Sequence, residues 1–290
     1  MMKHAYLIMA HTNIDQLKIL IDCLDDERND IYIHIDKKTK WPKIKNCITA
    51  EKARVIFIKR IAVNWGGYSQ IRCELNLLRE AFFSGTDYAY YHLLSGCDLP
   101  LKSQDNIHRF FDEHQGKEFI GFSYETDEET CNRVNYYWFF QDLVGRNPGR
   151  IPNILRRLQH SILSFQKTNH LKRQHSVALY KGANWFSIDN DLVRYLLSKE
   201  RMIKKEFSFS CCADELFLPS IAMDSPFKDR ITNDSLREID WNRGEPYTYT
   251  ILDYDMLINS TGMFGRKFNI NTDREIVEAI HQYCKNGTDV

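Results

Sequence analysis

Residues 88–98 read Tyr88-Ala89-Tyr90-Tyr91-His92-Leu93-Leu94-Ser95-Gly96-Cys97-Asp98. The apolar first part is typical of a buried strand, and the polar last part, from Ser95 onward, lies where that strand would end. Similar apolar runs precede it at residues 5–10, 31–35 and 54–58. The first hundred residues are therefore expected to supply several buried strands.

Apolar residues at helical spacing lie between these runs, at residues 14–24 and again at residues 69–82. Strands that alternate with helices predict an α/β fold with a mostly parallel central sheet flanked by helices. Such sheets bind ligands beyond the carboxyl ends of their strands. The polar residues expected at that edge are His11, Asp36-Lys37-Lys38 and the segment from Ser95 to Asp98.

The composition restricts the class of protein. Hydrophobic residues make up 43% and charged residues 27% of the chain, which is typical of a globular protein and not of a disordered one. The formal net charge is zero, so no overall field attracts nucleic acid. No window of about 18 residues is apolar enough to span a membrane, and no Pro-, Gly- or Ser-rich linker divides the chain. We expect one domain, residues 1–290, in the cytoplasm.

Several common motifs are missing from the sequence. There is no G-x-G-x-x-G behind the first strand, no P-loop motif and no G-x-S-x-G elbow, which disfavours dinucleotide-dependent dehydrogenases, P-loop enzymes and serine hydrolases. The eight cysteines form no C-x-x-C pair, and no histidines lie at zinc-binding spacing from them. We expect reduced thiols, no bound metal and no cofactor.

One segment is strongly basic, because no acidic residue lies between Asp142 and Asp189. Apolar residues within it repeat at helical spacing and predict an amphipathic helix with a cationic outer face. They are Ile151, Leu155, Leu158, Ile162 and Phe165. Two interpretations stay open: the helix packs on the protein's own core, or residues 150–174 make peripheral contact with anionic lipid head groups on the inner face of the membrane.

Seven segments are more specific than any compositional argument. They are Leu7–His11, Ile33–Lys38, Trp65–Ser69, His92–Ser103, Lys181–Ser187, Ala213–Glu215 and Phe264–Phe268. In this order they resemble the core-2/I-branching β-1,6-N-acetylglucosaminyltransferase family, which also contains the peptide O-xylosyltransferases. The resemblance covers roughly residues 5–270.

The resemblance implies a GT-A type fold with a Rossmann-like nucleotide-sugar-binding half, residues 1–115, and an acceptor and catalytic half, residues 116–290. It also implies a UDP-sugar donor, inversion at the anomeric carbon and independence from a divalent metal. The sequence agrees with the last point in one respect, because a single carboxylate, Asp98, follows the fourth strand where most GT-A enzymes carry a D-x-D metal ligand pair. The D-x-D spacings at residues 189–191 and 253–255 are typical of a helix start and a turn. A metal-dependent transferase remains the alternative.

Arg266 and Lys267 are the candidate source of positive charge for the leaving diphosphate. Preorganised cations in a site shielded from water stabilise negative charge as it develops, and a guanidinium beside an ammonium suits two adjacent phosphates. The matching Arg-Lys pair contacts the diphosphate in the xylosyltransferase-like branch of the family. The alternative is a solvated pair at the end of a strand.

Glu215 is the candidate catalytic base, because an acceptor hydroxyl needs a positioned carboxylate to take its proton. The resemblance assigns this role to the Glu of the Asp-Glu pair, and Asp214 is expected to influence its neighbour. Residues 211–213 and 216–218 on either side are apolar, which predicts a raised pKa for Glu215. The alternative is an acidic helix N-terminus with no catalytic role.

The remaining contacts follow from the resemblance alone. Asp98 is expected to face the hydroxyls of the donor sugar. The nucleotide pocket is assigned to His11, Asp36, Trp65 and Gly66, and the acceptor contacts to Glu125, Arg133 and Trp241. A metal cluster of His11, His34 and Asp36 is a further alternative.

The sequence thus predicts a metal-independent glycosyltransferase that moves N-acetylglucosamine or a xylose-like sugar from UDP to a hydroxyl of a glycan or glycolipid through a β-linkage. Two rivals remain open. The chain could be a non-catalytic carbohydrate-binding protein with a degenerate transferase fold, or a membrane-surface scaffold that acts through its basic helix.

Overall fold

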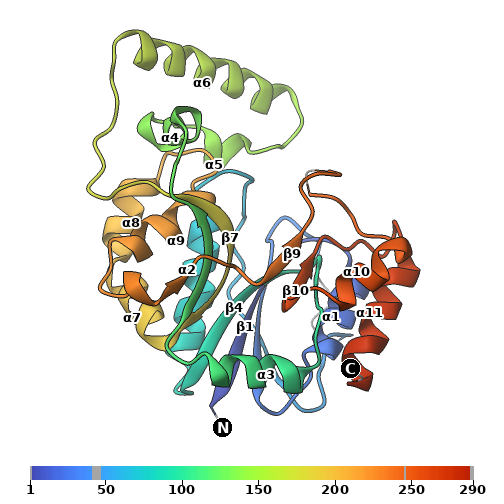
Figure 1. The fold of residues 1–290 in the computed structure, drawn as a ribbon. Coiled ribbons are helices and arrows are strands. Elements are labelled where there is room, and N and C mark those ends of the chain that lie inside the picture. Colours follow the sequence, from blue (N-terminus) through green and yellow to red (C-terminus); the bar gives the residue numbers. More distant parts are fainter. Residues whose placement is uncertain (1, 41–46, 245, 288–290) are drawn as a thin grey trace.

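The computed structural model describes residues 2–40, 47–244 and 246–287 (Figure 1). Within these residues, seven strands form a central sheet in the order β3-β2-β1-β4-β7-β6-β8. They are β1 (Lys3–Ala10), β2 (Asn29–Ile35), β3 (Arg54–Phe57), β4 (Tyr88–Ser95), β6 (Glu118–Ser123), β7 (Lys181–Asp189) and β8 (Ile231–Thr232). Only β7 runs antiparallel to its neighbours, β4 and β6. The predicted α/β class and mostly parallel sheet are confirmed, together with all the expected strands.

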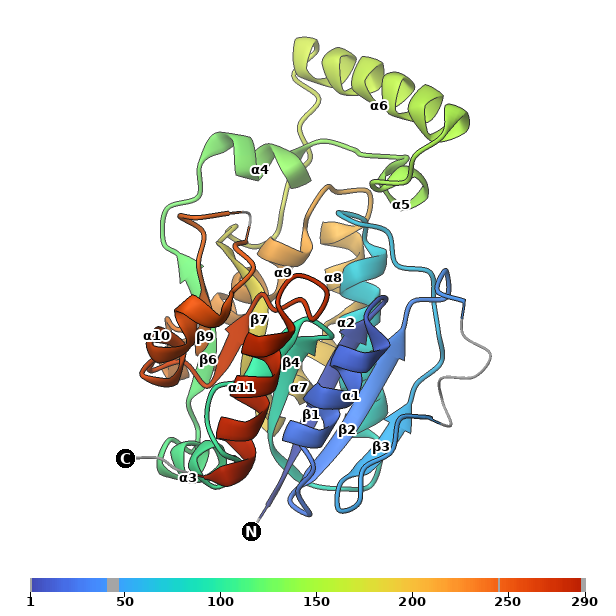
Figure 2. The same ribbon diagram turned by 90° about the vertical axis from the view of Figure 1, so that its right-hand side faces the viewer.

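Helices cover both faces of this sheet, as Figures 1 and 2 show. One face is covered by α1 (Ile14–Cys23), α3 (Gln104–Glu113) and α11 (Arg274–Asn286), and the other by α2 (Ser69–Phe82), α7 (Asn190–Ser198), α8 (Glu200–Phe207) and α9 (Asp214–Met223). Successive residues of β1 point to opposite faces, so Tyr6 and Ile8 pack in one hydrophobic core while Ala5 and Leu7 pack in the other. Burial on both faces explains why these strands read as continuous apolar runs.

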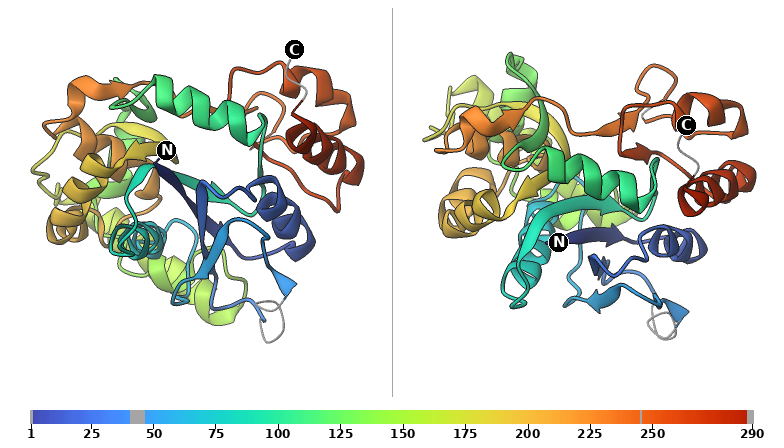
Figure 3. Two further views of the ribbon diagram at one scale, coloured as in Figure 1. Left: turned by 90° about the horizontal axis from the view of Figure 1, so that it is seen from below. Right: turned by 60° about the horizontal axis from the view of Figure 1, so that its bottom comes forward.

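A smaller sheet joins the two expected halves of the chain. It contains β5 (Asp98–Pro100), β10 (Phe264–Arg266) and β9 (Arg237–Ile239), with β10 in the middle. The short helix α10 (Tyr254–Ile258) packs against α11 beside it. Strand β5 comes from residues 1–115 and β10 from residues 116–290, so the two halves share one sheet. Figure 3 also shows C-terminal elements, in red, beside N-terminal ones, in blue.

A further layer of helices lies beyond the carboxyl ends of the strands and contains α4 (Glu128–Asn135), α5 (Gln141–Val144) and α6 (Arg150–Thr168) (Figure 2). The predicted amphipathic helix forms as α6. Of the two interpretations left open, packing of its apolar face on the protein's own core does not hold for Ile151, Leu158 and Phe165, which are exposed. The buried side of α6 carries Gln159, Leu163 and Gln166, and the two glutamines hydrogen-bond to the segment before the helix. No described helix has both the length and the apolar character needed to cross a bilayer.

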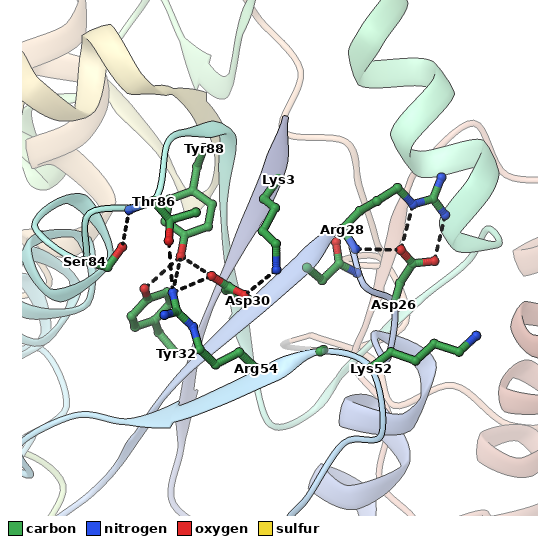
Figure 4. Close-up of polar contacts among 12 residues, drawn as sticks. Lys3, Asp26, Arg28, Asp30, Tyr32, Lys52, Arg54, Ser84, Thr86 and Tyr88 are labelled. Atoms are coloured by element: carbon green, nitrogen blue, oxygen red, sulfur yellow. Dashed lines mark hydrogen bonds and ion pairs between the residues drawn. The ribbon is translucent and has the colours of Figure 1, made fainter. Parts of the chain in front are cut away.

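The amino ends of the strands are held together by polar contacts (Figure 4). The buried carboxylate of Asp30, on β2, accepts hydrogen bonds from Lys3 on β1, from Arg54 on β3 and from the Tyr88 hydroxyl on β4. The buried carboxylate thus has hydrogen-bond partners on three other strands. These contacts tie the amino ends of the four strands to one another.

Candidate active site

Three polar segments meet at the carboxyl edge of the sheet, as the sequence predicts. Ala10 pairs with Ile35, and Met9 pairs with both His34 and Ser95, which places the residues that follow β1, β2 and β4 side by side. The backbone N–H of Asp36 donates to the Ala10 carbonyl at 2.9 Å, and the N–H of Gly96 donates to the Met9 carbonyl at 3.1 Å. This edge is the expected ligand-binding position in a parallel α/β sheet.

Arg266 is fixed at this edge by a buried counter-ion. Strand β10 lies antiparallel to β5, so Arg266 sits directly opposite Asp98, which is 1% exposed. The Arg266 Nη1 donates to Asp98 Oδ1 at 2.8 Å and to Ser95 Oγ at 2.5 Å, and the guanidinium carbon lies 4.4 Å from the centre of the Trp185 ring. Among the described residues, Nε and Nη2 of Arg266 have no hydrogen-bond acceptor. The guanidinium is held on one side and has donors available on the other.

Asp98 has both of its oxygens occupied in this arrangement. Oδ2 accepts the backbone N–H of Ser95 at 2.6 Å, and Oδ1 accepts the Ser95 hydroxyl at 2.9 Å in addition to Arg266. Burying a charge without a partner is costly, and this network supplies the partners. Asp98 is therefore the group that orients Arg266, while its predicted contact with a donor sugar stays a prediction.

Positive charge accumulates around His11. The Lys267 ammonium, which is half-buried, has no hydrogen-bond or ion-pair partner among the described residues. The pKa of His11 lies below its usual value, mainly because of desolvation and further because of the charges of Lys38, Lys267 and Arg266, against the opposing effect of Asp36. The surroundings of His11 at the end of β1 therefore contain several cations, which favours an anionic ligand.

Glu215 lies in the first turn of α9 and forms an ion pair with Arg133 on α4. The Arg133 Nη1 donates to Glu215 Oε2 at 2.9 Å, and the two side chains are 30% and 37% exposed. Oε1 of Glu215 accepts no hydrogen bond from the described residues. The expectation of an apolar setting for Glu215 is wrong, because the apolar neighbours in sequence turn toward the core and leave this carboxylate at the surface of the site.

Asp214 is the buried member of the Asp-Glu pair. Its Oδ2 accepts hydrogen bonds from Gln70 at 2.8 Å and from Asn184 at 3.4 Å, while Oδ1 has no partner among the described residues. Burial, with Glu215 next to it, raises the pKa of Asp214 to about 7. The sequence predicted a raised pKa for Glu215, but the carboxylate whose pKa is raised by burial is its neighbour Asp214.

A second buried carboxylate, Glu74, was not found by sequence reasoning. Its side chain is fully buried, and Oε1 accepts a hydrogen bond from the same Asn184 amide at 3.3 Å. Burial first, and the nearby Asp214 second, raise the pKa of Glu74 well above its usual value. A signal was present in the sequence, because Glu74 lies among the apolar positions Ile71, Leu75 and Leu78 of one helix face.

Two consecutive residues of β7 contact the buried carboxylates on one side and Arg266 on the other. Asn184 bonds to Asp214 and Glu74, and Trp185 stacks on Arg266. The segment that contains these two residues was recognised in the sequence, but neither was assigned a role. Strand β7 therefore links the carboxylates of α9 and α2 to the cation of β10.

The loop that contains Gly66 and Gly67 packs against the turn that precedes α9. The Gly66 carbonyl accepts the backbone N–H of Cys212 at 2.8 Å, and Gly66 has a φ of +69°, which favours glycine. A Cβ on Gly67 would lie 2.2 Å from Asp142 Oδ1. The glycines thus permit close approach to the protein's own chain. The nucleotide role of Gly66 stays a prediction, as does that of the exposed Trp65, whose ring lies 3.6 Å from the Arg146 guanidinium.

Comparison with known proteins identifies the family. The Core-2/I-Branching enzyme family model matches residues 4–257, which is most of the chain. The chain belongs to this family. A xylosyltransferase of Caenorhabditis briggsae, sqv-6, is 24% identical over 87% of this chain and 33% of its own length, and a human N-acetyllactosaminide β-1,6-N-acetylglucosaminyl-transferase is 23% identical over 95% and 70%. The chain spans about a third of the length of the xylosyltransferases that it matches.

A likeness to solved structures is also present. The mouse xyloside xylosyltransferase 1, in its apo form, aligns over 94% of this chain and 99% of its own with 12% identity and a TM-score of 0.42. This likeness is too remote to bear on function. The assignment of the Core-2/I-branching family depends on the family match.

The two D-x-D spacings of this Core-2/I-branching chain are used as helix caps. Asp189 pairs in register with Tyr90, at the amino end of β4 and away from the site, and it accepts the backbone N–H groups of Asp191 and Leu192. Asp253 accepts the N–H and the hydroxyl of Thr250. Both aspartates also pair with arginines, so the carboxylates of Asp189 and Asp253 are already engaged within the protein.

The alternative metal cluster fails at His34. Its Nε2 accepts the backbone N–H of Ile61 at 3.0 Å, which occupies the lone pair that a metal would need. Within the described part of the chain, no three His, Cys, Asp or Glu side chains are arranged to hold a metal ion. His34 is therefore a buried histidine with a structural hydrogen bond.

The predicted acceptor residues are only partly brought together. Arg133 reaches Glu215 directly, whereas Glu125 and Trp241 are exposed and no hydrogen bond or ion pair joins either of them to Glu215. Exposed aromatic rings are suited to stack on sugar rings, so an acceptor role for Trp241 stays a prediction. The Arg133 interaction is the contact that links the acceptor segment to the carboxylate.

Proposed function

We propose that the chain is an inverting glycosyltransferase of GT-A type that moves a sugar from a UDP-sugar to a hydroxyl of a glycan or glycolipid and forms a β-linkage. The donor sugar is N-acetylglucosamine or a xylose-like sugar, because the names of the relatives describe these two transfers. One observation carries the proposal. Arg266 and Lys267 present open donors at the carboxyl edge of the sheet in a Core-2/I-branching chain.

Glu215 acts as the general base in this proposal. A sugar hydroxyl has a pKa far above neutrality and attacks only as its proton is removed. The Oε1 of Glu215 is open to an incoming hydroxyl, and the ion pair with Arg133 orients the carboxylate through Oε2. Attack opposite the leaving UDP inverts the anomeric carbon.

Arg266 and Lys267 stabilise the departing diphosphate, and no divalent ion takes part. Arg266 is oriented in advance by Asp98 and Ser95, so it needs no reorganisation when charge develops on the phosphate oxygens. Lys267 adds a compact charge that no described side chain neutralises. His11, Asp36, Trp65 and Gly66 line the nucleotide pocket in this proposal.

The first test is a screen for UDP release with different UDP-sugars, followed by the variant Glu215→Gln. We expect one donor to be hydrolysed or transferred, and we expect the variant to lose at least about 100-fold in rate while its affinity for UDP stays unchanged. Glu278→Gln, an exposed glutamate on α11, is the matched control and keeps full activity. Sugar binding without UDP release in the wild type would identify a carbohydrate-binding protein instead, and full activity of Glu215→Gln would remove the assigned base.

A further inference from the structure

Helix α6 is the outermost element of the molecule, beyond the carboxyl edge of the sheet (Figures 1 and 2). Two glutamines attach it to the segment before it. The Gln159 Oε1 accepts the backbone N–H of Phe140 at 2.9 Å, and the Gln166 Oε1 accepts the backbone N–H of Tyr137 at 2.9 Å. These hydrogen bonds and the buried Leu163 between the two glutamines fix the position of α6.

A different side of α6 exposes large apolar residues. Ile151 is 71% exposed, Ile154 is 54%, Leu158 is 47% and Phe165 is 62%. Spacings of three, four and seven residues place all four on one helix face. Exposed apolar residues scattered singly need no explanation, but a contiguous stripe along a helix marks an interaction surface.

Helix α6 itself carries charge of one sign. No Asp or Glu occurs between Asp142 and Asp189, and the basic residues of α6 are Arg150, Arg156, Arg157 and Lys167. Arg156 donates to the carbonyls of Gly145 and Asn147, whereas Arg150 and Arg157 are exposed. Arg150 and Arg157 lie four and three residues from Ile154, so they flank the stripe on its solvent side. An apolar stripe with a basic flank is complementary to a surface that is apolar inside and negatively charged outside.

We propose that α6 is an interfacial helix that binds the surface of an anionic lipid bilayer. Its axis lies parallel to the membrane, with Ile151, Ile154, Leu158 and Phe165 inserted between the head groups and with Arg150 and Arg157 beside lipid phosphates and carboxylates. A second copy of this chain is a poorer occupant, because two apposed α6 helices would bring their basic flanks together. The inference does not depend on the proposed transferase activity.

The test is co-sedimentation of the full chain with vesicles of phosphatidylcholine alone and of phosphatidylcholine with phosphatidylserine. We expect the wild type to bind the anionic vesicles and to be released by high salt. Arg150→Glu with Arg157→Glu should weaken this binding by at least about 20-fold, because each basic residue near the surface contributes about five-fold. Ile154→Ser with Leu158→Ser should also abolish it.

A matched control reverses two exposed lysines on α8 in the variant Lys204→Glu with Lys205→Glu, which should bind as the wild type does. The melting temperature of every variant reports on folding, and none should change since the altered side chains are exposed. Equal binding to neutral and anionic vesicles, or no binding, would overturn the inference. A dimer in solution that Ile154→Ser with Leu158→Ser dissociates would also overturn it, because a second copy would then cover the stripe.

Discussion

Two arginine–carboxylate pairs lie in the candidate site, and they differ in their exposure to water. Arg266 pairs with Asp98, which is almost completely buried and also bonds to Ser95. Arg133 pairs with Glu215, and both of these side chains are about one-third exposed. The first pair is a fixed part of the fold, whereas the second can open without leaving a buried charge.

This difference matches the two roles in the proposed reaction. A cation that stabilises a leaving diphosphate must be in place beforehand, because reorganisation during the reaction would cost part of the stabilisation. A base must be within reach of the acceptor hydroxyl, and the exposed pair leaves Oε1 of Glu215 open. The buried pair and the exposed pair therefore suit the diphosphate and the hydroxyl, respectively.

The largest effect is expected for Arg266→Ala. The variant removes the oriented cation and leaves Asp98 buried without its counter-ion, so we expect the rate to fall by about 100- to 1,000-fold. We also expect the free energy of unfolding to fall by about 3–5 kcal/mol. UDP-release assays and urea denaturation measure the two effects. The exposed Arg274→Ala is the control, and a stable Arg266→Ala enzyme with full activity would contradict the assignment.

The variant Lys267→Met should lower the reaction rate without changing the stability of the fold. Since the Lys267 ammonium has no partner among the described residues, its loss should leave the urea midpoint unchanged. The rate should still fall by about 10- to 100-fold, because a charged hydrogen bond to the diphosphate is removed. Isothermal titration with UDP and steady-state kinetics test this, and a variant that binds UDP and turns over like the wild type would exclude Lys267 from the site.

The buried carboxylates should make stability depend on pH. The folded-state pKa of Asp214 is about 7 and that of Glu74 lies well above its usual value, so the folded chain holds more protons than the unfolded chain from about pH 4 upward. Stability should therefore decrease as pH rises through this window. Glu74→Gln should flatten that decrease and raise the melting temperature at pH 8. An unchanged pH profile in this variant would show that Glu74 does not titrate in this range.

The smallest effect is expected for the exposed pair. Arg133→Ala should change the free energy of unfolding by less than about 1 kcal/mol, as is usual for solvent-exposed ion pairs. Chemical denaturation provides the measurement, with Asp98→Asn as the comparison from the buried pair. A loss for Arg133→Ala as large as that for Asp98→Asn would remove the distinction between the two pairs.

Much of the scaffold could be predicted from the sequence. The apolar runs gave the positions of β1, β2, β3 and β4, because strands buried on both faces leave an unbroken signal. The polar segments after these strands were expected to meet and they do. Arg266 was found from the motif, although its pairing with Asp98 depends on the register between β5 and β10, which short strands do not encode.

The distribution of burial within the site could not be predicted. Asp214 and Glu215 are adjacent in sequence and share the same apolar flanks, and only the orientation of the first turn of α9 decides that Asp214 is buried and Glu215 is not. Glu74 and Asn184 reach Asp214 from other elements, so no local pattern connects them. Whether the apolar face of α6 is buried or exposed stayed open, because helical periodicity identifies an apolar face but not what covers it.

The central claim is that two side-chain cations take the place of a divalent ion, and transfer in the presence of EDTA tests it most directly. Wild-type protein and Lys267→Met are assayed side by side with the preferred UDP-sugar, first in EDTA and then with added Mn²⁺. We predict that the wild type is fully active in EDTA, gains nothing from Mn²⁺ and is far more active than the variant in both conditions. Activity that disappears in EDTA, returns with Mn²⁺ and is equal in the two proteins would contradict the claim.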